Sequence, residues 1–332
     1  MNVLFLGTAA GKPSNHRNVT SIAVILKNAE FILVDCGEAT QHQLMKSSLR
    51  MSKLKEIFIT HIHGDHVFGL PGLLCTLNEI RDEPLVIHGP PGIKSFLDSI
   101  LRFSHIQFKI HIYEMKNKFS AIISSIKSGT YNYTVQSCQV LHGVKCFAFK
   151  ITQFRDDMKV DKIKILKDID NYRSEIESLG FKPVERLISY LKSNDEVTMS
   201  NGFVFSAKNY EIKEEPCSVI IALDNYDCTI MISQFKYANM LVHECTYAIF
   251  PDMSPQETRV IEINACNHEH STNVMATKVA EALNVNTLIL THFSNRYDFT
   301  DEENIIAGCK PINTSLNIKC ARDFSEFYIC NK

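Results

Sequence analysis

Residues 61–66 read His61-Ile62-His63-Gly64-Asp65-His66, and this hexapeptide decides the expected fold. It follows the apolar run Ile57-Phe58-Ile59, which is typical of a buried strand that ends where the chain turns. Alternate side chains of an extended loop point the same way, so His61 and His63 can converge on one cation while Asp65 and His66 face a second point. Imidazole and carboxylate suit Zn²⁺, and less specifically Mn²⁺ or Fe²⁺. The competing interpretation is a polar surface turn, which is a weak explanation because the chain has only 13 histidines in 332 residues.

The length and composition allow one large folded domain: 332 residues are many for a single domain, but α/β domains often exceed 200. Hydrophobic residues make up 45% of the chain, enough for a large core, and no apolar stretch approaches the roughly 18 residues of a membrane span. The N-terminus resembles a first strand, not a signal peptide, and the 11 cysteines form no Cys-x-x-Cys pair. We therefore expect reduced thiols, no membrane association and a cytoplasmic location, with a nuclear one as the alternative. A net charge of −2 means that any RNA-binding surface must be local.

Strand-like and helix-like segments alternate along the chain, which predicts an α/β layer architecture. Expected strands are residues 3–6, 21–26, 31–34, 57–59, 85–87, 146–151, 218–223, 241–242 and 287–290. Expected helices are residues 39–47, 69–80, 93–103, 274–283 and 302–305. We expect one domain over residues 1–332, with residues 152–195 inserted as an arm. That segment is rich in both charge signs and has a helical apolar pattern at Ile163, Leu166, Ile169, Ile176 and Leu179. An ordinary solvated helical hairpin is the alternative.

Three later residues can complete a site for two metal ions. His142, Asp224 and His292 each lie just before or after an apolar run, where the loops of a sheet gather over one edge. In this interpretation His61, His63 and His142 hold one ion, Asp65, His66 and His292 hold the other, and Asp224 bridges them. Taken alone, Asp224 would more often be a cap or a turn former than a ligand, but the set together is a much stronger signal.

The whole pattern resembles the metallo-β-lactamase superfamily of binuclear zinc hydrolases, and further motifs resemble the ribonuclease Z family in its short form. Those motifs are residues 5–20, residues 35–44, His243-Glu244-Cys245-Thr246, His270-Ser271-Thr272, residues 290–297 and Asp323-Phe324. Two positions differ from the family pattern: Leu223-Asp224-Asn225 stands where Gly-Asp-Thr is usual, and residues 181–188 lack a Gly-Pro-Leu element.

The resemblance implies a four-layer αβ/βα sandwich with an inserted tRNA-binding arm. It also implies a zinc-dependent endoribonuclease that removes the 3′ trailer from precursor tRNA and leaves a 3′ hydroxyl, by hydroxide attack at two metal ions. The expected cofactors are two Zn²⁺ per subunit, with Mn²⁺ or another divalent ion possible. The expected partners are precursor tRNA and a second copy of the chain, whose arm serves the first copy's site.

Phosphodiester cleavage needs groups that move protons as well as metal ions. Asp65 can orient the attacking hydroxide or accept its proton. His270 is the candidate acid for the leaving 3′ oxygen, because imidazole titrates near neutral pH, and Glu244 is expected to fix its tautomer and raise its pKa.

Four further residues are expected to bind substrate. Arg17 and Asn18 follow the first strand, where a guanidinium could grip a phosphate, although a loop arginine paired with a carboxylate is equally plausible. Phe293 and Arg296 follow His292 and could stack on a base, or they could pack the last strand.

Two other function classes compete with the ribonuclease. A small-molecule hydrolase such as a lactonase or thioesterase would need no inserted arm, and a tRNA-binding module without catalysis would need no metal ligands.

Overall fold

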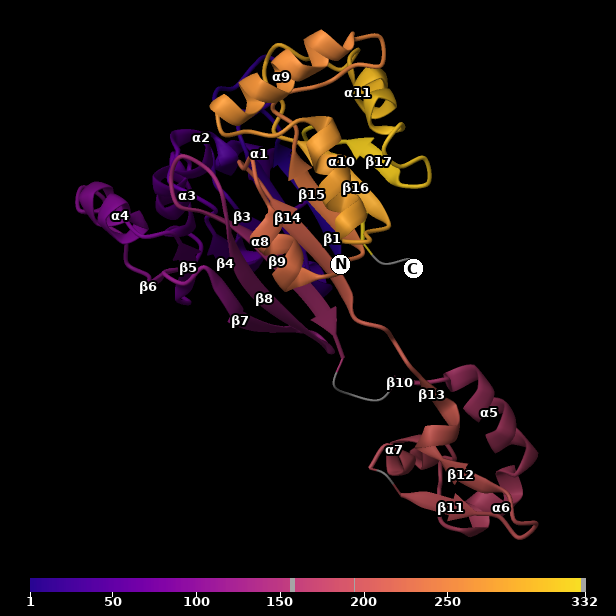
Figure 1. Ribbon diagram of the computed structural model, residues 1–332. Helices are drawn as coiled ribbons and strands as arrows, with labels where there is room; N and C mark the ends of the chain where they lie inside the picture. Colours follow the sequence, from indigo (N-terminus) through magenta and orange to yellow (C-terminus); the bar gives the residue numbers. More distant parts are fainter. Residues whose placement is uncertain (156–158, 194, 330–332) are drawn as a thin grey trace. The chain divides into compact units, whose positions relative to one another are not determined.

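The computed structural model describes residues 1–155, 159–193 and 195–329, and two seven-stranded sheets dominate it (Figure 1). The first sheet has the strand order β18-β1-β2-β3-β4-β5-β6, and the second has the order β17-β16-β15-β14-β9-β8-β7. The strands of the first sheet are β1 (Asn2–Gly7), β2 (Ser21–Ile25), β3 (Phe31–Val34), β4 (Leu54–Phe58), β5 (Leu85–Gly89), β6 (Ile110–Glu114) and β18 (Glu326–Tyr328). Those of the second are β7 (Phe119–Ser128), β8 (Tyr131–Val140), β9 (Cys146–Phe154), β14 (Cys217–Ala222), β15 (Met240–Glu244), β16 (Thr287–Thr291) and β17 (Asn317–Cys320).

The middle of each sheet is parallel. Strands β3 to β6 run parallel in the first sheet, and β14 to β17 run parallel in the second. Every residue of β3 and of β14 is buried, which is why both appear in the sequence as unbroken apolar runs. Parallel strands end at the same edge of a sheet, so the loops that follow β4, β14, β15 and β16 can meet there.

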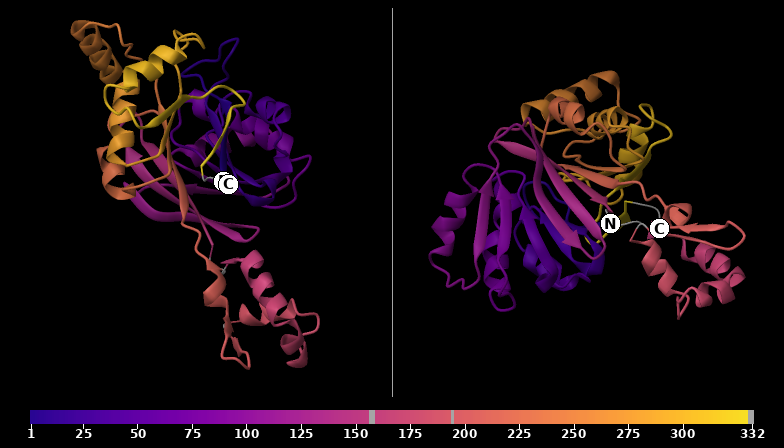
Figure 2. Two further views of the ribbon diagram at one scale, coloured as in Figure 1. Left: turned by 90° about the vertical axis from the view of Figure 1, so that its right-hand side faces the viewer. Right: turned by 90° about the horizontal axis from the view of Figure 1, so that it is seen from below.

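Helices cover the outer face of each sheet (Figures 1 and 2). Leu44 of α1, Leu73 of α3 and Leu97 of α4 share one core with the first sheet. Met231 of α8 and Ala276 of α10 share another with the second sheet. The helices of this part of the chain are α1 (Thr40–Lys46), α2 (Gly64–Val67), α3 (Leu70–Leu77), α4 (Ile93–Leu101), α8 (Thr229–Phe235), α9 (Pro255–Asn267), α10 (Asn273–Ala282) and α11 (Glu302–Cys309), with 3₁₀ turns at η1 (Lys27–Ala29) and η2 (Met51–Lys53).

The inner faces of the two sheets pack on each other. The rings of Phe58 in β4 and Phe149 in β9 meet edge to face, with centroids 5.5 Å apart, and both side chains are fully buried. The order of layers is therefore helix, sheet, sheet, helix. This confirms the expected α/β sandwich.

A second compact unit consists of Phe154–Pro216 together with Thr130–Asn132. It has its own core, in which Ile165, Ile169, Leu187 and Phe205 are all fully buried. Its elements are β10 (Lys159–Val160), α5 (Lys162–Asn171), α6 (Arg173–Ser178), α7 (Arg186–Leu191), β11 (Glu196–Thr198), β12 (Val204–Ser206), η3 (Ala207–Tyr210) and β13 (Glu211–Ile212).

This unit extends further along the chain than the expected arm of residues 152–195. Phe205 and Tyr210 lie beyond residue 195 and still belong to its core. The buried face of α5 also differs from the expected one. Ile165 and Ile169 are buried, whereas Ile163 is 85% exposed and Leu166 is 38% exposed. Asp161 caps α5 by accepting hydrogen bonds from the amides of Ile163 and Lys164, which fixes where the helix begins.

Nine cysteines of the described residues carry free thiols, but Cys217 is disulfide-bonded, so the expectation of reduced thiols is wrong at that position. Among the described residues, no helix combines the length and the apolar character that crossing a membrane requires.

Candidate metal centre and active site

The candidate ligands lie in loops at the ends of strands from both sheets. His61 and His63 follow β4, and Asp65 and His66 lie in α2 directly afterwards. His142 lies in the turn between β8 and β9, Asp224 follows β14, and His292 follows β16. The structure thus brings together all seven side chains expected to bind metal, from four separate stretches of the chain.

The first group consists of His61, His63, His142 and Asp224. Each residue offers one nitrogen or oxygen atom, and these four atoms all lie within 4.8 Å of one another. His142 Nε2 is 3.3 Å from His63 Nδ1, and Asp224 Oδ2 is 3.6 Å from His61 Nε2. Three imidazoles facing one carboxylate oxygen form a donor set that suits a divalent cation.

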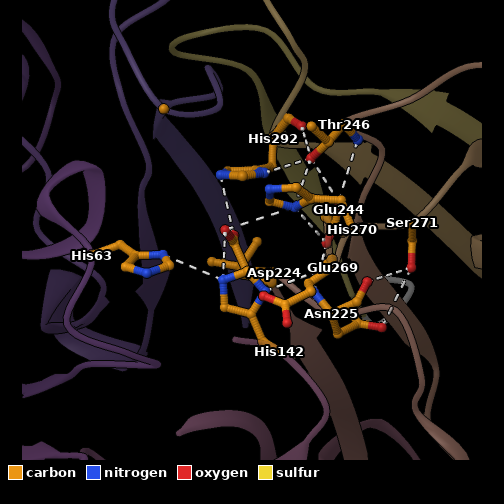
Figure 3. Close-up of polar contacts among 12 residues, drawn as sticks. His63, His142, Asp224, Asn225, Glu244, Thr246, Glu269, His270, Ser271 and His292 are labelled. Carbon is orange, nitrogen blue, oxygen red and sulfur yellow. Dashed lines mark hydrogen bonds and ion pairs between the residues drawn. The ribbon is translucent and has the colours of Figure 1, made fainter. Parts of the chain in front are cut away.

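The second group consists of Asp65, His66 and His292, and Asp224 joins it to the first. Asp65 Oδ2 is 3.4 Å from Nε2 of both histidines. Asp224 Oδ1 is 3.2 Å from His66 Nε2 and 3.1 Å from His292 Nε2. One oxygen of Asp224 therefore faces each group, and its side chain lies between His292 and His142 (Figure 3).

Several buried polar atoms of these residues lack hydrogen-bond partners, and this indicates whether the residues fit metal ions. His61 Nε2, His66 Nε2 and Asp224 Oδ1 are buried and make no hydrogen bond within the described part of the chain. Buried polar atoms without partners are costly, and native proteins avoid them unless something else binds there. All three point into the cluster, so the residues fit divalent cations.

The first histidine of the cluster is suited to donate a lone pair. Burial, and after it the neighbouring His66, lowers the pKa of His61 well below its usual value, so its ring is neutral. Burial alone would also lower the pKa of His66, but Asp224, Asp35 and Asp65 raise it well above the usual value. The second group therefore lies in a strongly negative environment, which attracts a cation.

Hydrogen bonds to the ring nitrogens that face away from the cluster orient two of the candidate ligands. Asp35 Oδ2 is 2.6 Å from His66 Nδ1, and Thr60 Oγ1 is 3.0 Å from His61 Nδ1. Thr60 also donates to Asp35 through its hydroxyl and its amide, both at 2.7 Å. A proton on each of these Nδ1 atoms leaves Nε2 free to face the cluster, which is how metal-binding histidines are usually oriented.

His142 and Asp65 are held by main-chain groups. The carbonyl oxygen of Glu269 accepts a hydrogen bond from His142 Nδ1 at 2.8 Å. The amide of Gly11 donates to Asp65 Oδ2 at 2.7 Å. These contacts bring the first loop of the chain and the segment before His270 to the cluster.

His270 and Glu244 lie side by side, as expected. His270 Nδ1 is 3.2 Å from Glu244 Oε1 and 3.9 Å from Asp224 Oδ2. Glu244 is fully buried, and its two oxygens accept hydrogen bonds from the Asn225 amide and the Thr246 hydroxyl, both at 2.6 Å. Burial opposes the charge of His270, but Glu244 and Asp224 raise its pKa to about 9. The imidazole therefore carries a proton at neutral pH and can donate it.

Arg17 is not placed to grip a phosphate, contrary to expectation. It is 4% exposed, and its guanidinium pairs with Glu302 at 3.2 Å. The same group donates to the Thr8 hydroxyl and the Ala321 carbonyl, and it lies 4.6 Å from the ring centroid of Phe293. These contacts favour the alternative, a loop arginine paired with a carboxylate, because they use the donors that a phosphate would need.

The other three residues expected to bind substrate are Asn18, Phe293 and Arg296, and they differ in exposure and contacts. The Asn18 side-chain amide donates to the Glu38 carbonyl at 2.9 Å, so it stabilises the loop. Phe293 is 1% exposed and belongs to the core of the second sheet, which favours the packing alternative. Arg296 is exposed, and its guanidinium lies 4.9 Å from the ring centroid of Tyr247. Of the four residues, Arg296 alone presents its charge at the surface.

Sequence reasoning missed the residues that orient the cluster, namely Gly11, Asp35, Thr60 and Thr246. A carboxylate or hydroxyl commonly accepts a hydrogen bond from a metal-binding histidine. Polar residues that follow other predicted strands could therefore have been predicted as partners of the ligands. Asp35 follows β3 and Thr60 follows β4, directly before His61. No comparable signal marks Gly11, whose backbone amide makes the contact.

Solved structures with similar architecture identify the class of fold. The short form of human tRNase Z superposes over 100% of both chains, with a TM-score of 0.63 and 24% identity. YhfI of Bacillus subtilis, a metallo-β-lactamase fold protein, has a TM-score of 0.61 and 16% identity over 98% of both chains. The chain therefore has the metallo-β-lactamase fold.

Curated relatives identify the family. The chain is 35% identical to the ribonuclease Z of Pediococcus pentosaceus over 98% of its own length and 97% of the relative's. It is 32% identical to the ribonuclease BN of an Enterobacter species over 98% of its length and 99% of the relative's. The profile of a family described as anti-Pycsar protein Apyc1 also matches residues 1–161. The chain belongs to the ribonuclease Z family of metal-dependent endoribonucleases.

Proposed function

We propose that this chain cuts the 3′ trailer from precursor tRNA and leaves a 3′ hydroxyl, using two zinc ions. The observation that carries this proposal is the position of Asp224, with one carboxylate oxygen toward each group of candidate ligands. Family membership supports the choice of substrate, since the relatives of similar length are named ribonuclease Z.

In this proposal His61, His63 and His142 hold one ion, and Asp65, His66 and His292 hold the other, with Asp224 shared. Zn²⁺ suits a set of imidazoles and carboxylates, and Mn²⁺ is the alternative. Two such ions, when bound, supply Lewis acidity to the phosphate and lower the pKa of water.

Asp65 orients the attacking water and accepts its proton. Its Oδ2 atom is held by the Gly11 amide at 2.7 Å and lies between His66 and His292. A carboxylate fixed in this way is suited to act as a base beside the phosphorus atom.

His270 donates a proton to the leaving 3′ oxygen. Without that proton the oxygen would depart as an alkoxide, which is a poor leaving group. Glu244 acts on His270 as a positioning residue, because its carboxylate lies 3.2 Å from His270 Nδ1 and favours the protonated ring.

The second compact unit binds tRNA, and the enzyme works as a homodimer in the cytoplasm. The core of this unit supports the first statement, since a separately folded insertion can present a surface to a large substrate. A small-molecule hydrolase would have no use for such an insertion.

A 3′-extended tRNA transcript incubated with zinc tests the proposal, with sequencing of the product end. We expect one major cut at the 3′ side of the tRNA body and a 3′ hydroxyl on the product. Metal content measured on the same preparation should approach two ions per chain. Intact transcript alongside rapid hydrolysis of a lactone or thioester would instead support the small-molecule hydrolase, and binding without any cut would support the tRNA-binding module.

A further inference from the structure

The loop after β1 and the loop after His292 are joined by backbone hydrogen bonds next to the candidate ligands. The Phe293 amide donates to the Thr8 carbonyl at 2.9 Å, and the Ala10 amide donates to the Phe293 carbonyl at 2.9 Å. The side-chain amide of Asn295 then donates to the carbonyls of Lys12 at 2.9 Å and Pro13 at 3.3 Å. Residues 8–13 and 293–296 therefore form one edge, which we call the two-loop edge.

The two-loop edge borders the candidate active site. Gly11, one residue before Lys12, donates its amide to Asp65 Oδ2 at 2.7 Å. Phe293 directly follows His292, one of the candidate ligands. At Gly11, where φ is +71°, an added Cβ atom would meet no other atom within 4 Å, so there is open space at this residue. A substrate strand bound at Asp65 would pass next to this edge.

The two-loop edge carries two exposed cations without acidic partners. Lys12 and Arg296 are exposed, and neither forms an ion pair with any residue that the structure describes. The nearest carboxylate along the second loop, Asp298, is engaged with the amide and hydroxyl of Thr300 at 2.7 and 2.6 Å. Arg296 is also oriented, because its Nε atom donates to the Ser294 hydroxyl at 3.0 Å.

We propose that Lys12 and Arg296 together bind a backbone phosphate of the RNA next to the one that is cut. This inference rests on the proposed function and adds a residue, Lys12, that takes the role expected of the buried Arg17. Contacts to phosphate set the register of a nucleic acid on a protein without reading its sequence. Two unpaired cations suit that task, because one follows Gly11, which contacts Asp65, and the other lies four residues after His292. They also supply the local positive charge that a chain of net charge −2 needs.

Single substitutions of the two cations test the proposal on the 3′-extended tRNA transcript. Lys12→Ala and Arg296→Ala should each raise KM by roughly three- to tenfold, since each removes one exposed charge contact. Each should also reduce the slope of log KM against log salt by about one, as expected for one lost phosphate contact. Lys12→Arg keeps the charge, so its KM and its salt slope should equal those of the wild type. Lys278→Ala, which removes an exposed lysine from α10, is the matched control and should change neither.

A small phosphodiester, bis(p-nitrophenyl) phosphate, separates binding from damage to the cluster. The loss of kcat/KM in Lys12→Ala should be several times larger on the transcript than on this substrate, which has no neighbouring phosphate. Equal losses on both would mean that the substitution disturbs Asp65 through Gly11, and the proposal would be wrong. A salt slope equal to that of Lys278→Ala would overturn it as well. Failure of the wild-type enzyme to cut the transcript would instead refute the proposed function.

Discussion

The hydroxyl of Thr246 lies 2.9 Å from Nδ1 of His292, so one small side chain supports a candidate metal ligand. The same hydroxyl donates to Glu244 Oε2 at 2.6 Å, and Glu244 in turn contacts His270. A short chain of hydrogen bonds thus connects the second group of ligands to the proposed acid. Orientation of a ligand and protonation of the acid are therefore coupled through one residue.

Thr246→Val should lower kcat by roughly 10- to 100-fold, because it removes this shared hydrogen-bonding group while keeping the side-chain volume. Thr246→Ser retains the hydroxyl and is the matched control. Steady-state kinetics and zinc titration of both variants provide the measurement. Full activity and unchanged zinc affinity in Thr246→Val would show that the hydroxyl has no such role.

Asp65→Ala should lower turnover of precursor tRNA by roughly 10²- to 10⁴-fold or more, since it removes both a base and a candidate ligand. Binding of the transcript, measured by filter retention, should persist. Asp82→Ala, at an exposed acidic residue elsewhere, should behave like the wild type. Cleavage at the wild-type rate in Asp65→Ala would refute the catalytic assignment.

Glu244→Gln should shift the pH–rate profile. The Glu244 carboxylate helps to raise the pKa of His270, so its loss lowers that pKa. An acid must be protonated to act, so the alkaline fall in kcat/KM should begin at a lower pH in the variant than in the wild type. The profile should be measured on the zinc-loaded enzyme. If the alkaline fall occurs at the same pH in the variant and the wild type, His270 is not the proton donor.

Removal of the metal ions should destabilise the fold. Without cations the cluster leaves several buried donor atoms unpaired, so chelation should lower the melting temperature and added Zn²⁺ should restore it. A ligand at a hundred times its Kd contributes about 2.7 kcal/mol per site. Asp224→Asn should bind less zinc and gain less stability from it. An equal melting temperature with and without chelator would contradict the assignment.

The second compact unit can be removed at its base. Gln153 of β9 pairs directly with Cys217 of β14 in an antiparallel register, so a two-residue Asn-Gly turn can replace residues 154–216. The shortened enzyme should show a larger rise in KM for tRNA than loss of activity on bis(p-nitrophenyl) phosphate. Equal losses on both substrates would count against a tRNA-binding role.

Strong apolar runs made the central strands predictable. Residues 31–34 were expected as a strand and form β3, and residues 287–290 form most of β16. The hairpin of β7 and β8 was missed, because its residues are mostly half-buried or exposed and give no continuous apolar signal. Helix α9 was missed for a related reason: Ala265 is its only fully buried residue among those described, so its sequence lacks an apolar stripe.

The candidate ligands could be predicted because each is a metal-binding residue type at the end of an apolar run. Arg17 could not, because its burial depends on Glu302 and Phe293, which lie almost three hundred residues away in the sequence. The buried face of α5 could not be predicted either, because Ile165 and Ile169 are buried by packing with Leu187 and Phe205 further along the chain. Predictions failed where packing between residues far apart in the sequence decided the outcome.

The direct pairing of Gln153 with Cys217 also bears on how such a protein can evolve. An insertion that leaves and re-enters the sheet at neighbouring positions can be gained or lost without changing the strands whose loops carry the candidate ligands. A lineage could therefore exchange one RNA preference for another, or abandon RNA altogether, by recombination at this single junction.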